Sequence, residues 1–319
     1  MPTPDSFAPV AITTRSGLDE SVHFGAVVGL GPDGSVEFAV GDANAIVYPR
    51  SSNKPMQAVA MVRAGLALPP ELLALVCASH DGTPVHTAAA ERILAGAGLD
   101  ATALGNVASL PLDQASAEAV LRAGGQRTPL LMNCSGKHSG MLATCVLNGW
   151  AHDHGYLAVD HPLQLAITDV IDELCDEPHA HIGVDGCGAP AHAMSLVGLA
   201  RAFRCIANGS AGDAGRQVYE AMTVHPEMVG GERRDVTTFM RHVPGLMAKD
   251  GADGVFAAAL PDGRAIALKI ADGGDRARPP VMVAALEALG IDTAAVAALV
   301  EERILGHGQR VGSVRAIAP

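Results

Sequence analysis

The sequence has little positive charge and no basic run. Of its 319 residues, 22 are Lys or Arg and 34 are Asp or Glu, so the formal net charge is −12. Proteins that bind nucleic acid neutralise phosphates with clustered Lys and Arg, whereas this chain scatters its few cations. The sequence therefore predicts no nucleic-acid partner.

Long apolar runs are also missing. The most apolar windows are broken by Asp, Glu, Gly or Pro well before the ~18 residues that a transmembrane helix needs. The N-terminal stretch MPTPDSFAPV has neither the basic nor the apolar segment of a secretory signal. We therefore expect a soluble, cytoplasmic protein with no membrane partner. Its hydrophobic fraction of 49% is ample for a sizeable core.

The six cysteines include no C-x-x-C pair. In a chain of this size and compartment, we expect reduced thiols, either buried or metal-binding, rather than a disulfide framework. A cysteine with a special role must therefore be identified from its neighbours.

Strand-like runs lie near both ends of the chain. Residues 22–40 and 254–270 each contain two β-rich runs around a turn with Pro-Asp-Gly, which predicts two hairpins. Between them, apolar residues recur at three- and four-residue spacing, which is typical of helices. The predicted helices are at 86–99, 113–125, 138–150, 161–177 and 189–207, with two more at about 279–289 and 292–304.

This order of elements predicts an α+β fold, in which an antiparallel sheet is built from N- and C-terminal strands and helices cover its faces. The chain shows no internal repeat, linker or low-complexity tract. We expect a single domain over residues 1–319, with a large helical subregion at about 80–225.

Residues that could carry chemistry gather in short junctions between these elements, and the first is YPRSSNKPMQ. Ser51 and Lys54 are three residues apart, so on a helix they would share a face and the amine could reach the hydroxyl. Pro55 fits the first turn of a helix whose N-cap is Ser51 or Ser52. The alternative is that the serines only cap this helix and Lys54 is a solvated charge.

Further junctions contain polar groups and cysteines. An apolar run ends in Ser79–Gly82, where polar groups either line a cleft or form a simple turn. Cys134 stands at helical spacing from Lys137 and His138, and Cys187 is flanked by glycines. Two thiolates and one nitrogen would supply three of the four ligands of a zinc site. His138 is favoured over Lys137 as the nitrogen ligand, because a lysine must lose a proton before it can bind a metal. The alternative is that the cysteines are buried structural residues and bind no metal.

Lys269 stands on an otherwise apolar strand, in the stretch ALKIADGG. If its side chain faces inward, burial would lower its pKa and it could act as a base. At a sheet edge it would only reach out to solvent.

Taken together, these motifs resemble the rhizobial-type, class 3 L-asparaginases, often called asparaginase II. The motifs occur in the order RSGLDESVHFGAVV, RSSNKPMQA, ASHDGTPVH, NCSGKHSGML, GVDGCGAP, HPEMVGG, KDGADGVFAAAL and KIADGG. The fold of that family is similar to that of serine β-lactamases, penicillin-binding proteins and serine-dependent glutaminases. Of the class A lactamase motifs, S-x-x-K is present, S-D-N is absent, and KIADGG stands where K-T-G is expected, which disfavours β-lactam hydrolysis.

The resemblance implies a set of site residues, a zinc ion and a homodimer. The implied catalytic pairs are Ser51 with Lys54 and Ser79 with Lys269. The implied zinc ligands are Cys134, Lys137 and Cys187, beside the substrate pocket. The positions that match substrate-binding residues are Arg50, His138 and Asp185.

The expected activity is hydrolysis of L-asparagine to L-aspartate and ammonia. In this hypothesis Ser51 attacks the side-chain amide with Lys54 as base and forms a β-aspartyl-enzyme, and Ser79 is the rival nucleophile. The alternatives are a glutaminase or other serine amidohydrolase, a zinc-dependent hydrolase with Cys134, His138 and Cys187 on the metal, and a non-catalytic binding module.

Overall fold

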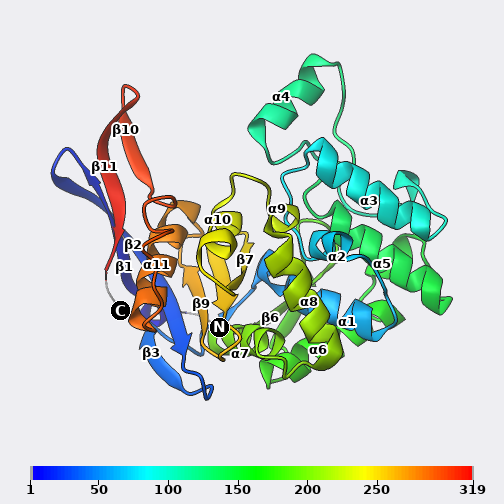
Figure 1. Ribbon diagram of the computed structural model, residues 1–319, viewed down its shortest axis with the longest axis horizontal. Helices are drawn as coiled ribbons and strands as arrows, with labels where there is room; N and C mark the ends of the chain where they lie inside the picture. The colour runs from blue at the N-terminus through cyan, green and yellow to red at the C-terminus, as the bar shows by residue number, and fades with distance from the viewer. Residues whose placement is uncertain (1–2, 318–319) are drawn as a thin grey trace.

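The computed structural model describes residues 3–317, which form an antiparallel sheet, helices packed on it, and a helical region beside it (Figure 1). This arrangement confirms the predicted α+β fold. Strands from both ends of the chain make up the main sheet, and the middle of the chain supplies most of the helices (Figure 1).

The main sheet has eight strands. Seven follow the order β10-β11-β1-β2-β9-β8-β7, and β3 pairs with β2 off this path, with every pair antiparallel. The strands are β1 (Ala8–Arg15), β2 (Leu18–Leu30), β3 (Val36–Val40), β7 (Met247–Gly251), β8 (Val255–Ala259), β9 (Ala265–Ile270), β10 (Arg303–Gly306) and β11 (Gln309–Ala316). The hairpins predicted at 22–40 and 254–270 are confirmed as β2–β3 and β8–β9.

A smaller sheet of three strands has the order β4-β6-β5. Its strands are β4 (Ile46–Val47), β5 (His181–Val184) and β6 (Pro190–Ser195). The loop between β5 and β6 contains Asp185 and Cys187, so this small sheet fixes two of the predicted site residues.

The helices follow the predicted pattern with two exceptions. They are α1 (Lys54–Arg63), α2 (Pro70–Val76), α3 (Pro84–Gly96), α4 (Gln114–Arg122), α5 (Ser135–Asn148), α6 (Pro162–Cys175), α7 (Leu196–Ala207), α8 (Gly212–Val224), α9 (Pro226–Val229), α10 (Asp235–His242) and α11 (Arg278–Ala288). The first part of the helix predicted at 189–207 is wrong, because Pro190–Ser195 forms strand β6 and the helix α7 begins only at Leu196. The helix predicted at 292–304 is also wrong: this stretch forms turns and then enters β10. Val296 and Val300 are buried there at helical spacing, but separate turns are enough to bury both. No helix among residues 3–317 is long and apolar enough to cross a membrane.

The core lies on both faces of the sheet centre. All five residues of β8 are buried, which requires cover on each face. Helix α7 packs against β2, β8 and β9, and α11 packs against β1, β9 and β11. The edge strand β7 instead faces the helical region, where it packs against α8, α10 and the short 3-10 helix η2 (Arg50–Asn53). Ser51 and Ser79, two of the predicted site residues, lie along this seam.

Candidate active site

The first junction begins with η2, and α1 continues directly from it at Lys54. Pro55 lies in the first turn of α1, as predicted. The N-cap is Asn53, however, and neither serine caps the helix, because the extra 3-10 turn places both serines before it. The Ser52 hydroxyl instead donates to the carbonyl of Lys249 on β7, at 3.0 Å.

The amine of Lys54 is directed at Ser79 rather than at Ser51. Its Nζ donates to Ser79 Oγ at 3.1 Å, to Cys134 Sγ at 3.1 Å and to the carbonyl of Ala78 at 2.5 Å. An ammonium group has three N–H donors, so these contacts use all of them. The Ser51 hydroxyl makes no side-chain hydrogen bond within residues 3–317, and Ser51 is half-buried. The expected Ser51–Lys54 contact is therefore not made in this conformation.

Ser79 lies between two lysines, and the second is Lys249. Lys249 Nζ donates to Ser79 Oγ at 3.1 Å, and to the carbonyl and Oδ1 of Asp250 at 2.7 and 2.5 Å. Lys269, the expected partner, donates to the carbonyls of Asp253 and Ile270 instead. The expected pairing of Ser79 with Lys269 is thus corrected, because Lys269 is on β9, separated by β8 from the strand that faces Ser79.

Lys249 and Asp250 are the site residues that the sequence reasoning missed. A usable signal was present, since Lys249-Asp250-Gly251 has the K-x-G spacing of the K-T-G motif that was assigned to KIADGG. Lys249 is more deeply buried than Lys269 and has no exposed surface. Burial lowers the pKa of Lys249 to about 8, although Asp250 acts in the opposite direction. Lys249 can therefore lose its proton near neutral pH and act as a base.

The two cysteines of the predicted zinc site are in contact. Cys134 and Cys187 pack together in one buried cluster, and Lys137 Nζ donates to Cys187 Sγ at 3.1 Å. The neighbouring Cys134 thiol, together with the Lys137 ammonium, holds the pKa of Cys187 far below its usual value despite burial. The neighbouring Cys187 and burial raise the pKa of Cys134.

The donor set of Cys134, Lys137 and Cys187 fits a zinc ion in chemical type, because zinc binds thiolates and nitrogen ligands. One ring nitrogen of His138, Nδ1, is 2.6 Å from the hydroxyl of Tyr156, and the other, the buried Nε2, has no hydrogen-bond partner among the described residues. Burial lowers the pKa of His138 to about 4. In the described part of the chain, no group of three or more His, Cys, Asp or Glu side chains is placed to hold a metal ion.

Arg50 and Asp185, two residues expected to bind the substrate, are brought together by the fold. Arg50 Nε donates to Asp185 Oδ1 at 2.8 Å, and another nitrogen of the guanidinium pairs with Asp253. Arg50 has a φ of 52°, in the left-handed region that non-glycine residues rarely adopt. Such strain is typical of functional positions, and it occurs here directly before Ser51.

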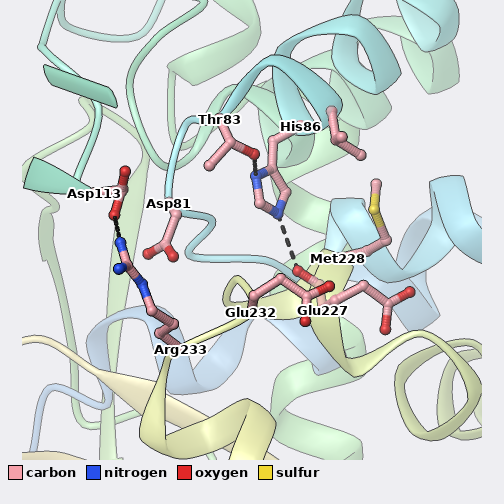
Figure 2. A pocket seen from close by; sticks show the side chains of 9 residues that line it. Asp81, Thr83, His86, Asp113, Glu227, Met228, Glu232 and Arg233 are labelled. Carbon is pink, nitrogen blue, oxygen red and sulfur yellow. Dashed lines mark hydrogen bonds and ion pairs between the residues drawn. The ribbon is translucent and has the colours of Figure 1, made fainter. Parts of the chain in front are cut away.

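Two cavities are lined by residues that neighbour the buried cluster in sequence. One, of about 780 Å³, is lined by apolar residues together with Arg50, Asp253 and Lys269. The other, of about 180 Å³, is lined by acidic residues and reaches Asp81, two residues after Ser79 (Figure 2). Lys269 thus belongs to the first cavity rather than to the contacts of Ser79.

Comparison with known proteins places the chain in a family. A family model described as L-asparaginase II matches residues 11–316. A search of curated proteins finds no match. Among solved structures, a "probable glutaminase" is 16% identical, with 85% of this chain and 87% of that chain covered and a TM-score of 0.48. A beta-lactamase from Mycobacterium bovis is also 16% identical, with 83% and 94% covered and a TM-score of 0.39. Because the family match runs from β1 to β11, the chain is an amidohydrolase that belongs to the L-asparaginase II family.

Proposed function

We propose that the protein hydrolyses the side-chain amide of L-asparagine to give L-aspartate and ammonia, at a serine–lysine centre formed by Ser51, Lys54, Ser79 and Lys249. The observation that supports this best is that the amines of both lysines donate to Ser79 Oγ at 3.1 Å. A serine hydroxyl is too weakly acidic to attack an amide unaided at neutral pH, so a neutral lysine must accept its proton. With a pKa of about 8, Lys249 supplies such an amine.

We assign the attack to Ser51 and the proton transfer to Ser79. The oxygen of Ser79 accepts two hydrogen bonds from lysines, which occupies both of its lone pairs and leaves its own hydrogen free to be donated. Ser51 is half-buried and its hydroxyl is free of side-chain hydrogen bonds to the described residues. Ser51 is therefore the serine with a lone pair available to attack, while Ser79 relays protons between the lysines and the reacting groups.

The proposed reaction has two steps, formation and hydrolysis of a β-aspartyl-enzyme. The Ser51 oxygen bonds to the amide carbon while its proton passes to a lysine of the cluster, and the C–N bond breaks as that proton is returned to the leaving ammonia. A water molecule next attacks the β-aspartyl ester, gives its proton to the same amine, and releases aspartate as the proton returns to Ser51.

Arg50 and Asp185 would hold the zwitterionic end of the amino acid. The guanidinium suits the substrate carboxylate, because it can donate two parallel hydrogen bonds, and the carboxylate of Asp185 suits the substrate ammonium group. Their mutual contact at 2.8 Å would be exchanged for these contacts when substrate binds.

We further propose that Cys134, Lys137 and Cys187 hold a zinc ion. When bound, the ion would orient the substrate and stiffen the pocket rather than generate hydroxide, because two thiolates nearly neutralise its charge. These residues also have a role that needs no metal. Cys134 accepts a hydrogen bond from Lys54, so the thiol cluster helps to fix that amine beside Ser79.

The proposal is tested by ammonia release from L-asparagine and L-glutamine, measured side by side on wild type, Ser51→Ala and Ser79→Ala. We expect faster release from asparagine, and a loss of about 10²-fold or more in both variants. Faster release from glutamine would make the protein a glutaminase, since one methylene in the pocket is worth only about 1–3 kcal/mol. Undiminished release by both variants would remove the serines from the mechanism.

The serine that attacks is identified by the covalent intermediate. Enzyme quenched during turnover of asparagine is digested, and the peptide that carries the aspartyl group is found by mass spectrometry. We expect the adduct on Ser51. Ser79 is the competing position because two lysines contact it, and an adduct on Ser79 would reverse the two roles.

A further inference from the structure

A chain of charged side chains lies behind the contact between Lys249 and Ser79. Asp250 Oδ1 accepts from Lys249 Nζ at 2.5 Å, and Asp250 Oδ2 accepts from Arg234 Nη2, also at 2.5 Å. Arg234 Nη1 then reaches Asp81 Oδ1 at 3.4 Å. We propose that Arg234 and Asp250 are positioning residues for catalysis, which hold the amine of Lys249 against the Ser79 hydroxyl.

The two ends of this chain are tied to each other by the backbone. The N–H groups of Ser79 and Asp81 donate to the carbonyls of Val229 and Gly230, at 3.0 and 2.7 Å. On this segment the Ser79 hydroxyl contacts Lys249, while the Asp81 carboxylate contacts Arg234. A Cβ atom on Gly231 would lie 1.9 Å from Asp81 Oδ2, so only glycine allows this carboxylate its position. The contacts from Ser79 through Lys249, Asp250, Arg234 and Asp81 thus form a closed ring.

The charges of the ring and of the neighbouring Lys54 favour the loss of a proton from one lysine. Lys54, Lys249 and Arg234 carry three positive charges when protonated, whereas Asp81 and Asp250 carry two negative charges. The side chains of Lys249 and Asp250 are 0% and 5% exposed, and those of Asp81 and Arg234 are 11% and 25% exposed. In a buried cluster, an excess positive charge favours the loss of one proton, and only the lysines can give one up.

The groups that face Lys249 act on it in opposite directions. Burial lowers its pKa to about 8, Asp250 on β7 raises it, and Lys54 from α1 and Arg234 from the loop before α10 lower it. The thiol of Cys77, at the end of α2, also faces this amine but is held neutral, because burial raises its pKa to about 12. Loss of the Asp250 charge and loss of the Arg234 charge should therefore move the titration of Lys249 in opposite directions.

The neighbouring Arg233 provides a matched control. It has the same charge and lies in the same loop, but its guanidinium donates to Asp113 and its side chain is 77% exposed. Figure 2 shows Arg233 turned toward Asp113 across the acidic cavity that Asp81 also lines. Arg233 has no hydrogen bond or ion pair with Asp250.

The test is the pH dependence of kcat/KM for amide hydrolysis in Arg234→Gln, Asp250→Asn and Arg233→Gln. The inflection of Arg234→Gln should move to higher pH and that of Asp250→Asn to lower pH, each by roughly one unit, which is the usual effect of a close charge. Arg233→Gln should keep the wild-type inflection. Displacement of the amine should also lower kcat about 10-fold or more in Asp250→Asn. Shifts in the same direction, or none, would overturn the inference.

The inference rests on the proposed function in one respect, namely that Lys249 exchanges a proton during turnover. A second measurement that does not depend on activity therefore separates the failure of the inference from the failure of the proposed function. NMR of ¹⁵N-lysine-labelled protein, with the Lys249 signal assigned from Lys249→Met, should give the same opposite shifts. Arg234→Lys keeps the charge and should titrate as wild type, which separates loss of the charge from a general disturbance of the ring. A Lys249 signal that titrates in Asp250→Asn as it does in wild type refutes the inference even if no amide is hydrolysed and even if Arg234→Gln does not fold.

Discussion

At the scale of single residues, the surroundings of Lys249 decide when it can act. It has no exposed surface, and its three donors are held by Ser79 and Asp250. The serine–lysine cluster therefore supplies a base within the protein rather than from solvent. Its protonation state, set mainly by burial, determines the pH range of activity.

Activity should rise with pH through the titration of Lys249. Below about pH 8 this amine is protonated and cannot accept the serine proton, and above that value it is neutral. We expect kcat/KM to increase with an inflection near 8, measured from about pH 6 to about pH 10 on protein whose folded state is checked at each pH. A flat or falling profile over that range would remove Lys249 as the base.

Zinc should stabilise the fold through Cys187. Zinc binds the folded site and not a preformed site in the unfolded chain, so a metal concentration of about 100 times the Kd should add about 2.7 kcal/mol to the free energy of unfolding. The measurement is the shift in melting temperature on adding zinc to wild type and to Cys187→Ser, with Cys205→Ser as the control far from the site. An equal shift in wild type and Cys187→Ser would contradict the proposed ligand set.

At the scale of elements, close packing of α5 on α2 links the thiol cluster to Ser79. A Cβ on Gly136 would lie 2.5 Å from the carbonyl oxygen and Cγ of Leu75, and one on Gly140 would lie 2.7 Å from a methyl group of Val76. Helix α5 carries the metal-binding candidates at its start, and α2 ends just before Ser79. The two glycines therefore let both functional groups come within reach of Lys54.

Replacing Gly136 should damage both stability and activity. The added methyl in Gly136→Ala meets backbone as well as side chain, so the helices must separate, at a cost of about 1–3 kcal/mol in the free energy of unfolding. Gly96→Ala, in α3, is the control, since a Cβ there meets no atom within 4 Å and alanine favours the helix. Denaturant unfolding and ammonia release measure both effects. Equal stability of the two variants would show that the helices are not held by this contact.

The elements that the sequence predicts well are those with strong local signals. The hairpins β2–β3 and β8–β9 have turn residues between apolar runs, and α1 begins next to Pro55 as expected. The stretch 292–304 has helical spacing without forming a helix, because the same spacing also suits consecutive turns. Local pattern alone could not separate these outcomes.

At the scale of the whole molecule, the site is assembled from segments that are far apart in the chain. The edge strand β7 brings Lys249 to Ser79, and the small sheet brings Cys187 to Cys134. The sequence indicated these junctions but not the role of Lys249 on β7, since Lys249 and Lys269 both follow apolar residues in strands. Only the strand order, which depends on long-range pairing, shows that β7 is the edge next to the helical region.

The central claim is that Lys249, and not Lys269, completes the serine–lysine centre of an amidohydrolase. The most direct test is ammonia release from L-asparagine by wild type, Lys249→Met and Lys269→Met, with folding checked by thermal unfolding. We expect Lys249→Met to lose about 10²-fold or more in kcat, because it removes a base that contacts Ser79, and Lys269→Met to keep most of the wild-type rate. Full activity of Lys249→Met together with inactivity of folded Lys269→Met would contradict this account.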